Sequence, residues 1–335
     1  MLAGATGIAG ALWAAGCARR QPPATAQMPA SGPAQQPESQ ANAKVGKNRH
    51  NPHPVAGLDA VVARSSSAIQ TKDDALNLLQ KALQPFGGME AFVSKGDVVV
   101  IKPNLAWARM PEQAANTQPA VLAAVVLACR QAGASDVVVV EHTCDQAVVS
   151  FDLSGAQEIC KQIDVPLVSL DNEQMYEDVP VRQGVNIRSE QVAADILDAD
   201  VYINLPICKV HGATTVTLAM KNQLGTVWRP QRYHEAKSEE EADENLHQNI
   251  ADLATALRPT LNIVDATRVL LTNGPKGPGK VGQPNALVVS PDIVAADATA
   301  CRFVDVKPEQ VGHIRIAAQA GIGRMEELQV KEVAV

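Results

Sequence analysis

Short runs of consecutive Val, Ile and Leu residues alternate along this chain with segments of helical periodicity. Residues 98–101 and 137–140 are apolar at every position, which is typical of strands buried on both faces of a sheet. Parallel strands of this kind need long crossover connections, usually helices. We therefore predict an α/β fold, a mostly parallel sheet with flanking helices and Rossmann-like layering.

The same reasoning gives an outline of the elements. Strands are predicted at residues 98–101, 137–140, 167–170, 201–205, 261–264 and 287–289. Helices are predicted at residues 73–83, 119–131, 156–163, 189–197, 245–257, 293–303 and 309–320. In such sheets ligands bind beyond the carboxyl ends of the strands, so the residues that follow each apolar run are the informative ones.

The N-terminal region differs in composition from the rest. Residues 1–17 form an apolar, Ala/Gly-rich run that ends in small residues before Cys17, which predicts a signal peptide with Cys17 as its lipidation site. No charged start precedes this run, so we expect the true start of the signal to lie upstream. Residues 18–54 are rich in Pro, Gln and Ala and predict an extended tether. Residues 55–335 are expected to form a single α/β domain.

Charge and composition narrow the function classes. The chain has a net charge of −7, and because residues 18–50 hold five bases and one acid, the remainder carries −11. With only 3% aromatic residues, nucleic-acid binding is not expected. No stretch after residue 17 is long and apolar enough to span a membrane. We expect an exported protein, periplasmic or anchored by lipid, whose only membrane contact is that lipid.

The cysteines give no metal-binding pattern. No pair is spaced Cys-x-x-Cys, so the chain is not expected to hold an iron–sulfur cluster of its own, and its cofactor is unknown. Cys129, Cys160 and Cys301 lie in apolar helical patterns that are typical of a core.

Cationic and polar residues follow the strand predicted at 201–205. Residues 204–215 predict a strand-to-helix turn leading into 216–224, a place where backbone N–H groups favour an anion. We expect a strand-end site for an anionic ligand that also draws on a second strand end, at 102–104. Its candidate ligand-binding residues are Lys102, Asn104, Lys209, Thr214, Thr215, Lys221 and Asn222. Thr214 or Thr215 could instead cap the helix, and Lys209 could be a solvated loop residue.

A glycine-rich loop at 273–280 adds Gly274 and Gly277 as ligand-binding candidates, because glycine allows close backbone approach to a ligand. The loop matches neither the P-loop nor the dinucleotide fingerprint, and an ordinary surface loop is the alternative. Asp265 ends a strand and Asp297 lies in an apolar helix, so each needs a partner: a lysine, a cap or a metal. These two are the candidate metal ligands.

Several of these motifs occur together in one known family. They are Val99-Val100-Ile101-Lys102-Pro103-Asn104, Cys208-Lys209-Val210-His211, Thr217-Leu218-Ala219-Met220-Lys221-Asn222-Gln223-Leu224-Gly225, Asn273-Gly274-Pro275 and Ser290-Pro291-Asp292. Over about residues 95–333 the chain resembles the domain-of-unknown-function family 362. The resemblance implies an α/β fold and export. Because some relatives carry a ferredoxin-like module, it also implies a loose tie to redox work, with a redox partner protein. This chain lacks that module.

Two hypotheses about function follow. In the first, the protein is an enzyme acting on an anionic, phosphate- or carboxylate-bearing substrate or cofactor. His211 would be its general acid/base, Asp265 would orient His211 or bind a cation, and Cys208 or Cys144 would supply a thiol. In the second, the protein is a non-catalytic periplasmic lipoprotein that binds, matures or delivers a cofactor through the same lysines.

Overall fold

A computed structural model describes residues 57–235 and 239–335. The predicted signal peptide, the Cys17 lipidation site and the whole tether predicted at residues 18–54 lie outside the described residues. In the described part, no helix is both long and apolar enough to cross a membrane.

The strands and helices have the following bounds. The strands are β1 (Ala60–Arg64), β2 (Val98–Pro103), β3 (Asp136–Glu141), β4 (Leu167–Ser169), β5 (Tyr176–Pro180), β6 (Ser189–Ala193), β7 (Val201–Leu205), β8 (Ile207–His211), β9 (Thr215–Thr217), β10 (Leu261–Leu270), β11 (Val281–Gly282), β12 (Ala286–Ser290) and β13 (Val330–Ala334). The α-helices are α1 (Lys72–Leu83), α2 (Pro119–Gln131), α3 (Ala147–Leu153), α4 (Ala156–Gln162), α5 (Ala194–Asp198), α6 (Ala219–Asn222), α7 (Glu239–Ala256), α8 (Ile293–Ala300) and α9 (Gly312–Gln319).

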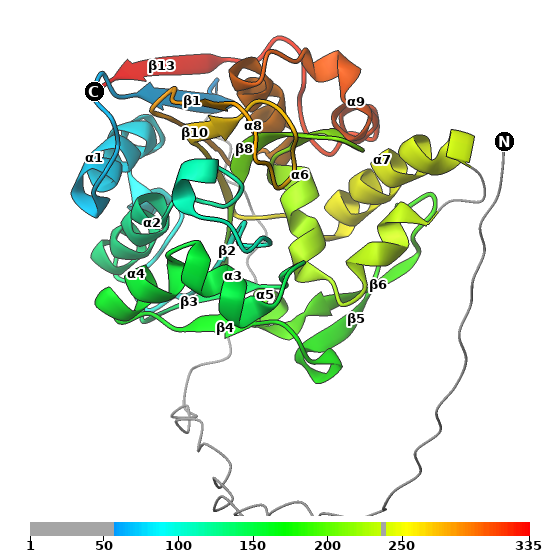
Figure 1. The fold of residues 1–335 in the computed structure, drawn as a ribbon, viewed down its shortest axis with the longest axis horizontal. Helices are drawn as coiled ribbons and strands as arrows, with labels where there is room; N and C mark the ends of the chain where they lie inside the picture. The colour runs from blue at the N-terminus through cyan, green and yellow to red at the C-terminus, as the bar shows by residue number, and fades with distance from the viewer. Residues whose placement is uncertain (1–56, 236–238) are drawn as a thin grey trace, which may run out of the picture. The chain divides into compact units, whose positions relative to one another are not determined.

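One large mixed sheet forms the centre of the domain, in the order β13-β1-β12-β10-β7-β2-β3-β4 (Figure 1). The run from β10 to β4 is parallel throughout, whereas β12 pairs antiparallel with both β10 and β1. A separate antiparallel hairpin joins β5 to β6. The predicted α/β fold with a mostly parallel sheet is confirmed.

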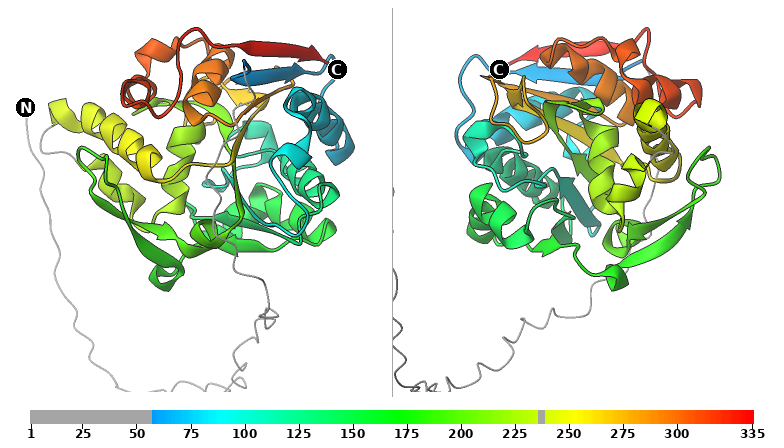
Figure 2. Two further views of the ribbon diagram at one scale, coloured as in Figure 1. Left: turned by 180° about the vertical axis from the view of Figure 1, so that it is seen from behind. Right: turned by 45° about the vertical axis from the view of Figure 1, so that its right-hand side comes forward.

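Both faces of the sheet are buried, as the uninterrupted apolar runs require. On one face Val99 and Ile101 of β2 pack against α1, α2 and α4. On the other face Val100 and Tyr202 pack among α6, α7, α8 and α9. Figure 2 shows these two helical layers with the sheet between them. Alternate residues of one strand therefore serve two separate hydrophobic clusters.

Two predictions about local structure are wrong. The helix predicted at 189–197 begins only at Ala194, because the five residues before it pair with β5 as strand β6. The strand-to-helix turn predicted at 204–215 is a hairpin of β8 and β9 instead. The long strand β10 outruns β7, and β8 supplies the parallel partner for its second half, so buried backbone groups stay hydrogen-bonded. Helix α6 is correspondingly short, running only over Ala219–Asn222.

The strand order reverses next to β2. The chain places β3 and β4 on one side of β2 and then returns to place β7 on the other side. In α/β sheets such a reversal opens a crevice at the carboxyl ends of the strands. Here that edge carries Lys102 at the end of β2 and Glu141 at the end of β3.

Candidate functional site

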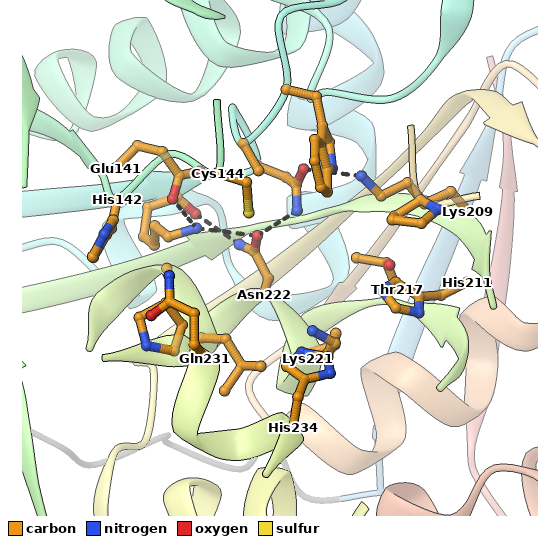
Figure 3. A pocket seen from close by; sticks show the side chains of 18 residues that line it. Glu141, His142, Cys144, Lys209, His211, Thr217, Lys221, Asn222, Gln231 and His234 are labelled. Carbon is orange, nitrogen blue, oxygen red and sulfur yellow. Dashed lines mark hydrogen bonds and ion pairs between the residues drawn. The ribbon is translucent and has the colours of Figure 1, made fainter. Parts of the chain in front are cut away.

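A small cavity of about 150 Å³ lies at this switch point (Figure 3). Figure 3 shows Cys144 and Asn222 near its centre, Glu141 and His142 on one side and Lys209 on the other. The residues that line it come from strand ends, the β8–β9 hairpin, α6 and the segment after it. They are Lys102, Asn104, Ala106, Trp107, Glu141, His142, Cys144, Lys209, His211, Thr217, Lys221, Asn222, Leu224, Gly225, Pro230, Gln231, His234 and Pro275.

A buried ion pair forms part of the cavity wall. Lys102 Nζ lies 2.8 Å from Glu141 Oε1, and both side chains are only 1% exposed. Burial lowers the pKa of Lys102 and raises the pKa of Glu141, while the opposite charge of each partner offsets part of both shifts. Gly225 lies against this pair. A Cβ at Gly225 would stand 2.5 Å from Lys102 Cε and 2.7 Å from Nζ, so only glycine fits there.

A chain of asparagine amides connects the ion pair to the neighbouring strands. Asn222 Oδ1 accepts hydrogen bonds from Lys102 Nζ at 3.1 Å and from Asn104 Nδ2 at 2.9 Å. Asn222 Nδ2 donates to Asn204 Oδ1 at 2.8 Å, and Asn204 Nδ2 donates to Asn262 Oδ1 at 3.1 Å. These amides are buried, so their hydrogen bonds fix the positions of Asn104 and Asn222.

Lys209 is buried without a carboxylate partner among the described residues. Its Nζ donates to Asn104 Oδ1 at 3.2 Å and to the Ala115 carbonyl oxygen at 2.5 Å, both of which are uncharged. The side chain is 1% exposed, and burial lowers the pKa of Lys209 to about 7. The nearby charge of Lys221 acts in the same direction.

Lys221 and Thr217 line the cavity, and neither side chain has a partner in the described part of the chain. Lys221 Nζ makes neither a hydrogen bond nor an ion pair there, and burial lowers the pKa of Lys221 to about 8. The Thr217 hydroxyl is unpaired although the residue is only 3% exposed. Buried polar groups nearly always have partners, so the unpaired Thr217 hydroxyl is unusual, and the partly buried Lys221 adds a cation to the same cavity.

His211 has a fixed tautomer. Its Nδ1 accepts hydrogen bonds from the backbone N–H groups of Ala213 at 3.1 Å and Thr214 at 3.3 Å. An acceptor Nδ1 places the proton on Nε2, so neutral His211 is a hydrogen-bond donor at Nε2. Burial, followed by the charge of Lys221, lowers the pKa of His211 to about 3. This geometry makes neutral His211 a hydrogen-bond donor at Nε2, and the general acid/base role predicted for it stays a prediction.

His142 has the opposite tautomer. Its Nδ1 lies 3.0 Å from the Val227 carbonyl oxygen, which only accepts, so Nδ1 carries the proton and Nε2 is left with a lone pair. The Tyr176 hydroxyl also contacts Nδ1 at 3.0 Å, and the Trp228 ring packs against both rings. Burial lowers the pKa of His142, so the ring is neutral at pH 7. His142, for which no role was predicted, therefore offers a basic nitrogen.

The cysteine prediction needs correction. Cys208 is fully buried outside the cavity lining, in the same hydrophobic cluster as Cys301, and its Sγ contacts the Ala300 carbonyl oxygen at 3.7 Å. Burial raises the pKa of the Cys208 thiol well above its usual value, so it is placed as a core residue and not as a reactive thiol. Cys144 does line the cavity, but burial and the charge of Glu141 raise its thiol pKa as well.

The two candidate metal carboxylates hold backbone groups instead. Asp265 accepts from Gln118 N and from the Thr267 N–H and hydroxyl, so it does not orient His211. Asp297 accepts from Ala219 N and Met220 N at the start of α6, which makes it a cap supplied from α8. In the described residues, no group of three or more His, Cys, Asp or Glu side chains could hold a metal ion.

Four other predicted ligand-binding residues lie outside the cavity lining. Thr214 donates to the Val216 carbonyl oxygen, and Thr215 has a φ of 63° in the hairpin turn, so neither caps α6. Position 274 requires glycine because a Cβ there would collide with the Val210 backbone. Gly277 has a φ of 64°, in the left-handed region that favours glycine. Their loop contributes Pro275 to the cavity rim.

The structure thus brings together Lys102, Asn104, Lys209, His211, Lys221 and Asn222 from the predicted set. Glu141 and His142 directly follow a predicted strand and so belong to the strand-end residues expected to be informative, but no role was predicted for them. Thr217 and His234 were not among the predicted site residues. Their positions carried no such strand-end signal, because the β8–β9 hairpin and the short helix of residues 230–234 bring them to the cavity.

A comparison with protein families agrees with the resemblance found in the motifs. The model of the family described as "Domain of unknown function (DUF362)" matches residues 99–302. The chain is 28% identical over 248 residues to "Thylakoid-associated protein sll1697" from Synechocystis sp., covering 73% of this chain and 74% of that protein. A solved structure from Thermotoga maritima aligns with a TM-score of 0.41 and 11% identity, covering 76% of this chain and 60% of that protein.

Proposed function

This chain belongs to the DUF362 family, and from its cavity we propose that it binds a small anionic ligand through a phosphate or carboxylate group. The observation that carries the proposal is the unpaired Lys221 ammonium beside the unpaired Thr217 hydroxyl. The Nε2–H of His211, which also lines the cavity, offers a further donor. All three groups donate, and anions accept.

The charge balance of the lining supports an anion. Lys102 and Glu141, the one carboxylate of the lining among the described residues, compensate each other's charge, which leaves Lys221 as a cation without an anionic partner there. The size of the cavity limits the ligand. A volume of about 150 Å³ is comparable to roughly five water molecules in the liquid. A larger ligand would place only its anionic end inside.

Binding is tested by calorimetric titration of the full chain with inorganic phosphate and, separately, with glycolate. We expect saturable binding of at least one probe, weakened at least about tenfold by Lys221→Gln. Lys331→Gln, an exposed lysine on β13, is the matched control and should bind like the wild type. Wild-type protein that binds neither anion, or a Lys221→Gln variant that binds as tightly as the control, would refute the proposal.

A second candidate function is acid–base catalysis on the bound anion, and the tautomer of His142 favours it. A neutral imidazole with a free Nε2 is a suitable general base, and His142 lines the same cavity. If the protein is such a catalyst, His142→Gln should abolish conversion of the bound anion and change its affinity by no more than about twofold. If the variant loses affinity and nothing else, the protein is a binding protein. The redox connection and the redox partner implied by the family resemblance stay predictions.

We also propose that the protein is exported and held at a membrane by lipid on Cys17. The apolar run before Cys17 and the tether after it support this, and a relative named for its thylakoid association fits a membrane-attached protein. Radiolabelled palmitate supplied to cells should label the wild-type protein and not Cys17→Ser. Equal labelling of both would overturn the lipidation proposal.

A further inference from the structure

The Lys209 amine is set apart from the other cavity lysines by its hydrogen-bond partners. Lys102 is equally buried, but Glu141 lies 2.8 Å from it and compensates its charge. Lys209 Nζ meets only two uncharged oxygens, Asn104 Oδ1 and the Ala115 carbonyl oxygen. An ammonium ion buried without a counter-charge is strongly disfavoured, so the site suits a neutral amine.

The number of acceptors fits the neutral form. A primary amine has two N–H bonds and one lone pair, and the two N–H bonds of Lys209 match its two acceptors. The lone pair is then the one part of the amine nitrogen that takes no part in these two hydrogen bonds. Lys209 and Asn104 both line the cavity in which the ligand is proposed to bind.

Burial is the largest influence on the pKa of Lys209 and lowers it, while the surrounding charges act in both directions: Cys144 and Glu141 raise this pKa, and Lys221 and Lys102 lower it. Lys221 lines the same cavity without an anionic partner among the described residues, and its positive charge opposes protonation of Lys209. Burial lowers the pKa of Lys209 to about 7 and that of Lys221 to about 8. Near pH 7 Lys209 is therefore the less protonated of the two lysines. An uncharged amine beside a cation is the usual arrangement of a nucleophilic lysine.

We propose that Lys209 is a nucleophile that forms an imine with a small oxo acid, whose carboxylate is held by Lys221 and Thr217. This inference rests on the proposed function, because the carboxylate must occupy the anion site. The Nζ lone pair attacks the carbonyl carbon and forms a C–N bond. The carbonyl oxygen leaves as water with the two amine protons, which gives a neutral imine, and no oxidant or reductant is needed.

The test uses reductive trapping on the full chain. The protein is incubated with pyruvate and sodium cyanoborohydride at pH 7.5, and the modified lysine is located by peptide mass spectrometry. We expect one adduct, at Lys209, formed at least tenfold faster than at any other lysine. Lactate, which has the same carboxylate but no carbonyl, should protect Lys209 and form no adduct.

Lactate binding also separates the two proposals, because it requires the anion site and not the amine. If lactate binds and pyruvate leaves Lys209 unmodified, or modifies Lys221 instead, the imine proposal is refuted and the anion site stands. If neither lactate nor pyruvate nor phosphate binds, the anion site is refuted together with the imine. Lys209→Met should abolish the adduct and retain lactate binding. If this variant does not fold, the position of the adduct in the wild-type protein decides whether Lys209 forms the imine.

Discussion

Gly225→Ala tests whether the buried Lys102–Glu141 pair depends on the absence of a side chain at Gly225. The new Cβ would lie 2.7 Å from Lys102 Nζ and closer still to Glu141 Oε1. Restoring an ordinary contact requires Lys102 to move by nearly 1 Å. Lys102 Nζ is already bound by Glu141 Oε1 at 2.8 Å, the Pro103 carbonyl oxygen at 2.6 Å and Asn222 Oδ1 at 3.1 Å, so a movement of this size weakens at least one of these contacts.

The expected cost follows from the burial of both partners. Disrupting a buried ion pair typically costs about 3–5 kcal/mol, because it leaves charges without compensation. We therefore expect Gly225→Ala to lower the free energy of unfolding by about 3 kcal/mol or more, measured by urea denaturation. Gly225 does not have a positive φ, so backbone strain adds nothing to this value.

Gly212→Ala is the matched control for this measurement. A Cβ at Gly212 would have a single neighbour, the Gly274 carbonyl oxygen at 3.9 Å, and its φ is not positive either. The control should change the free energy of unfolding by less than about 1 kcal/mol. If Gly225→Ala loses no more than Gly212→Ala does, the ion pair does not depend on Gly225 and the packing argument is wrong.

Three further predictions concern the same cavity. Thr217→Val keeps the shape of a side chain whose hydroxyl has no partner, so urea denaturation should give a free energy of unfolding within about 1 kcal/mol of the wild type. Calorimetry should show phosphate binding weakened about 3–10-fold by the loss of the hydroxyl. If the phosphate affinity is unchanged, the Thr217 hydroxyl is not part of the anion site. Glycolate binding needs the Lys221 ammonium, which loses its proton as the pH rises past its pKa of about 8. Calorimetry above that pH should therefore show the Kd for glycolate rising about tenfold per pH unit in the wild type. The Kd of Lys221→Gln should hardly change with pH. A flat wild-type profile would contradict this. Asn222→Ala leaves several buried hydrogen-bond partners unsatisfied and should lower the free energy of unfolding by about 2–4 kcal/mol, measured by urea denaturation. Asn77→Ala, at an exposed position, is the control and should lower it by less than about 0.5 kcal/mol. Equal effects would mean that the chain of asparagine amides is not needed for stability.

The fold was predictable where the hydrophobic pattern alone determines it. Residues 98–101 and 137–140 could only be doubly buried strands, and both became parallel neighbours. The strand at Ser189–Ala193 was not predictable from its own pattern, because its pairing with β5 in a hairpin outweighs the local helical pattern. The hairpin of β8 and β9 depends likewise on the length of β10.

The candidate site was predictable in part for a related reason. Lys102, Lys209 and Lys221 stood out because lysine is rarely buried without cause, and all three line the cavity. What each lysine does depends on partners distant in sequence. Glu141 neutralises Lys102, whereas Lys209 meets only neutral oxygens. The roles predicted for Asp265 and Cys208 were wrong for the same reason, since both face away from the cavity toward backbone groups and core side chains.

The cavity has an inner wall and a rim, and the two differ in how much their amino-acid sequence can change without disturbing the structure. Its inner wall is Lys102, Glu141 and the asparagine chain, locked by hydrogen bonds between buried strands. Its rim includes Pro275, whose loop is held at the surface by the stacking of Lys276 on Trp107 and a hydrogen bond from Arg109 to the Lys276 carbonyl oxygen. Exchanging the rim loop should therefore alter which ligands enter while leaving the anion-binding chemistry intact, so one scaffold could be adapted to a series of different acids.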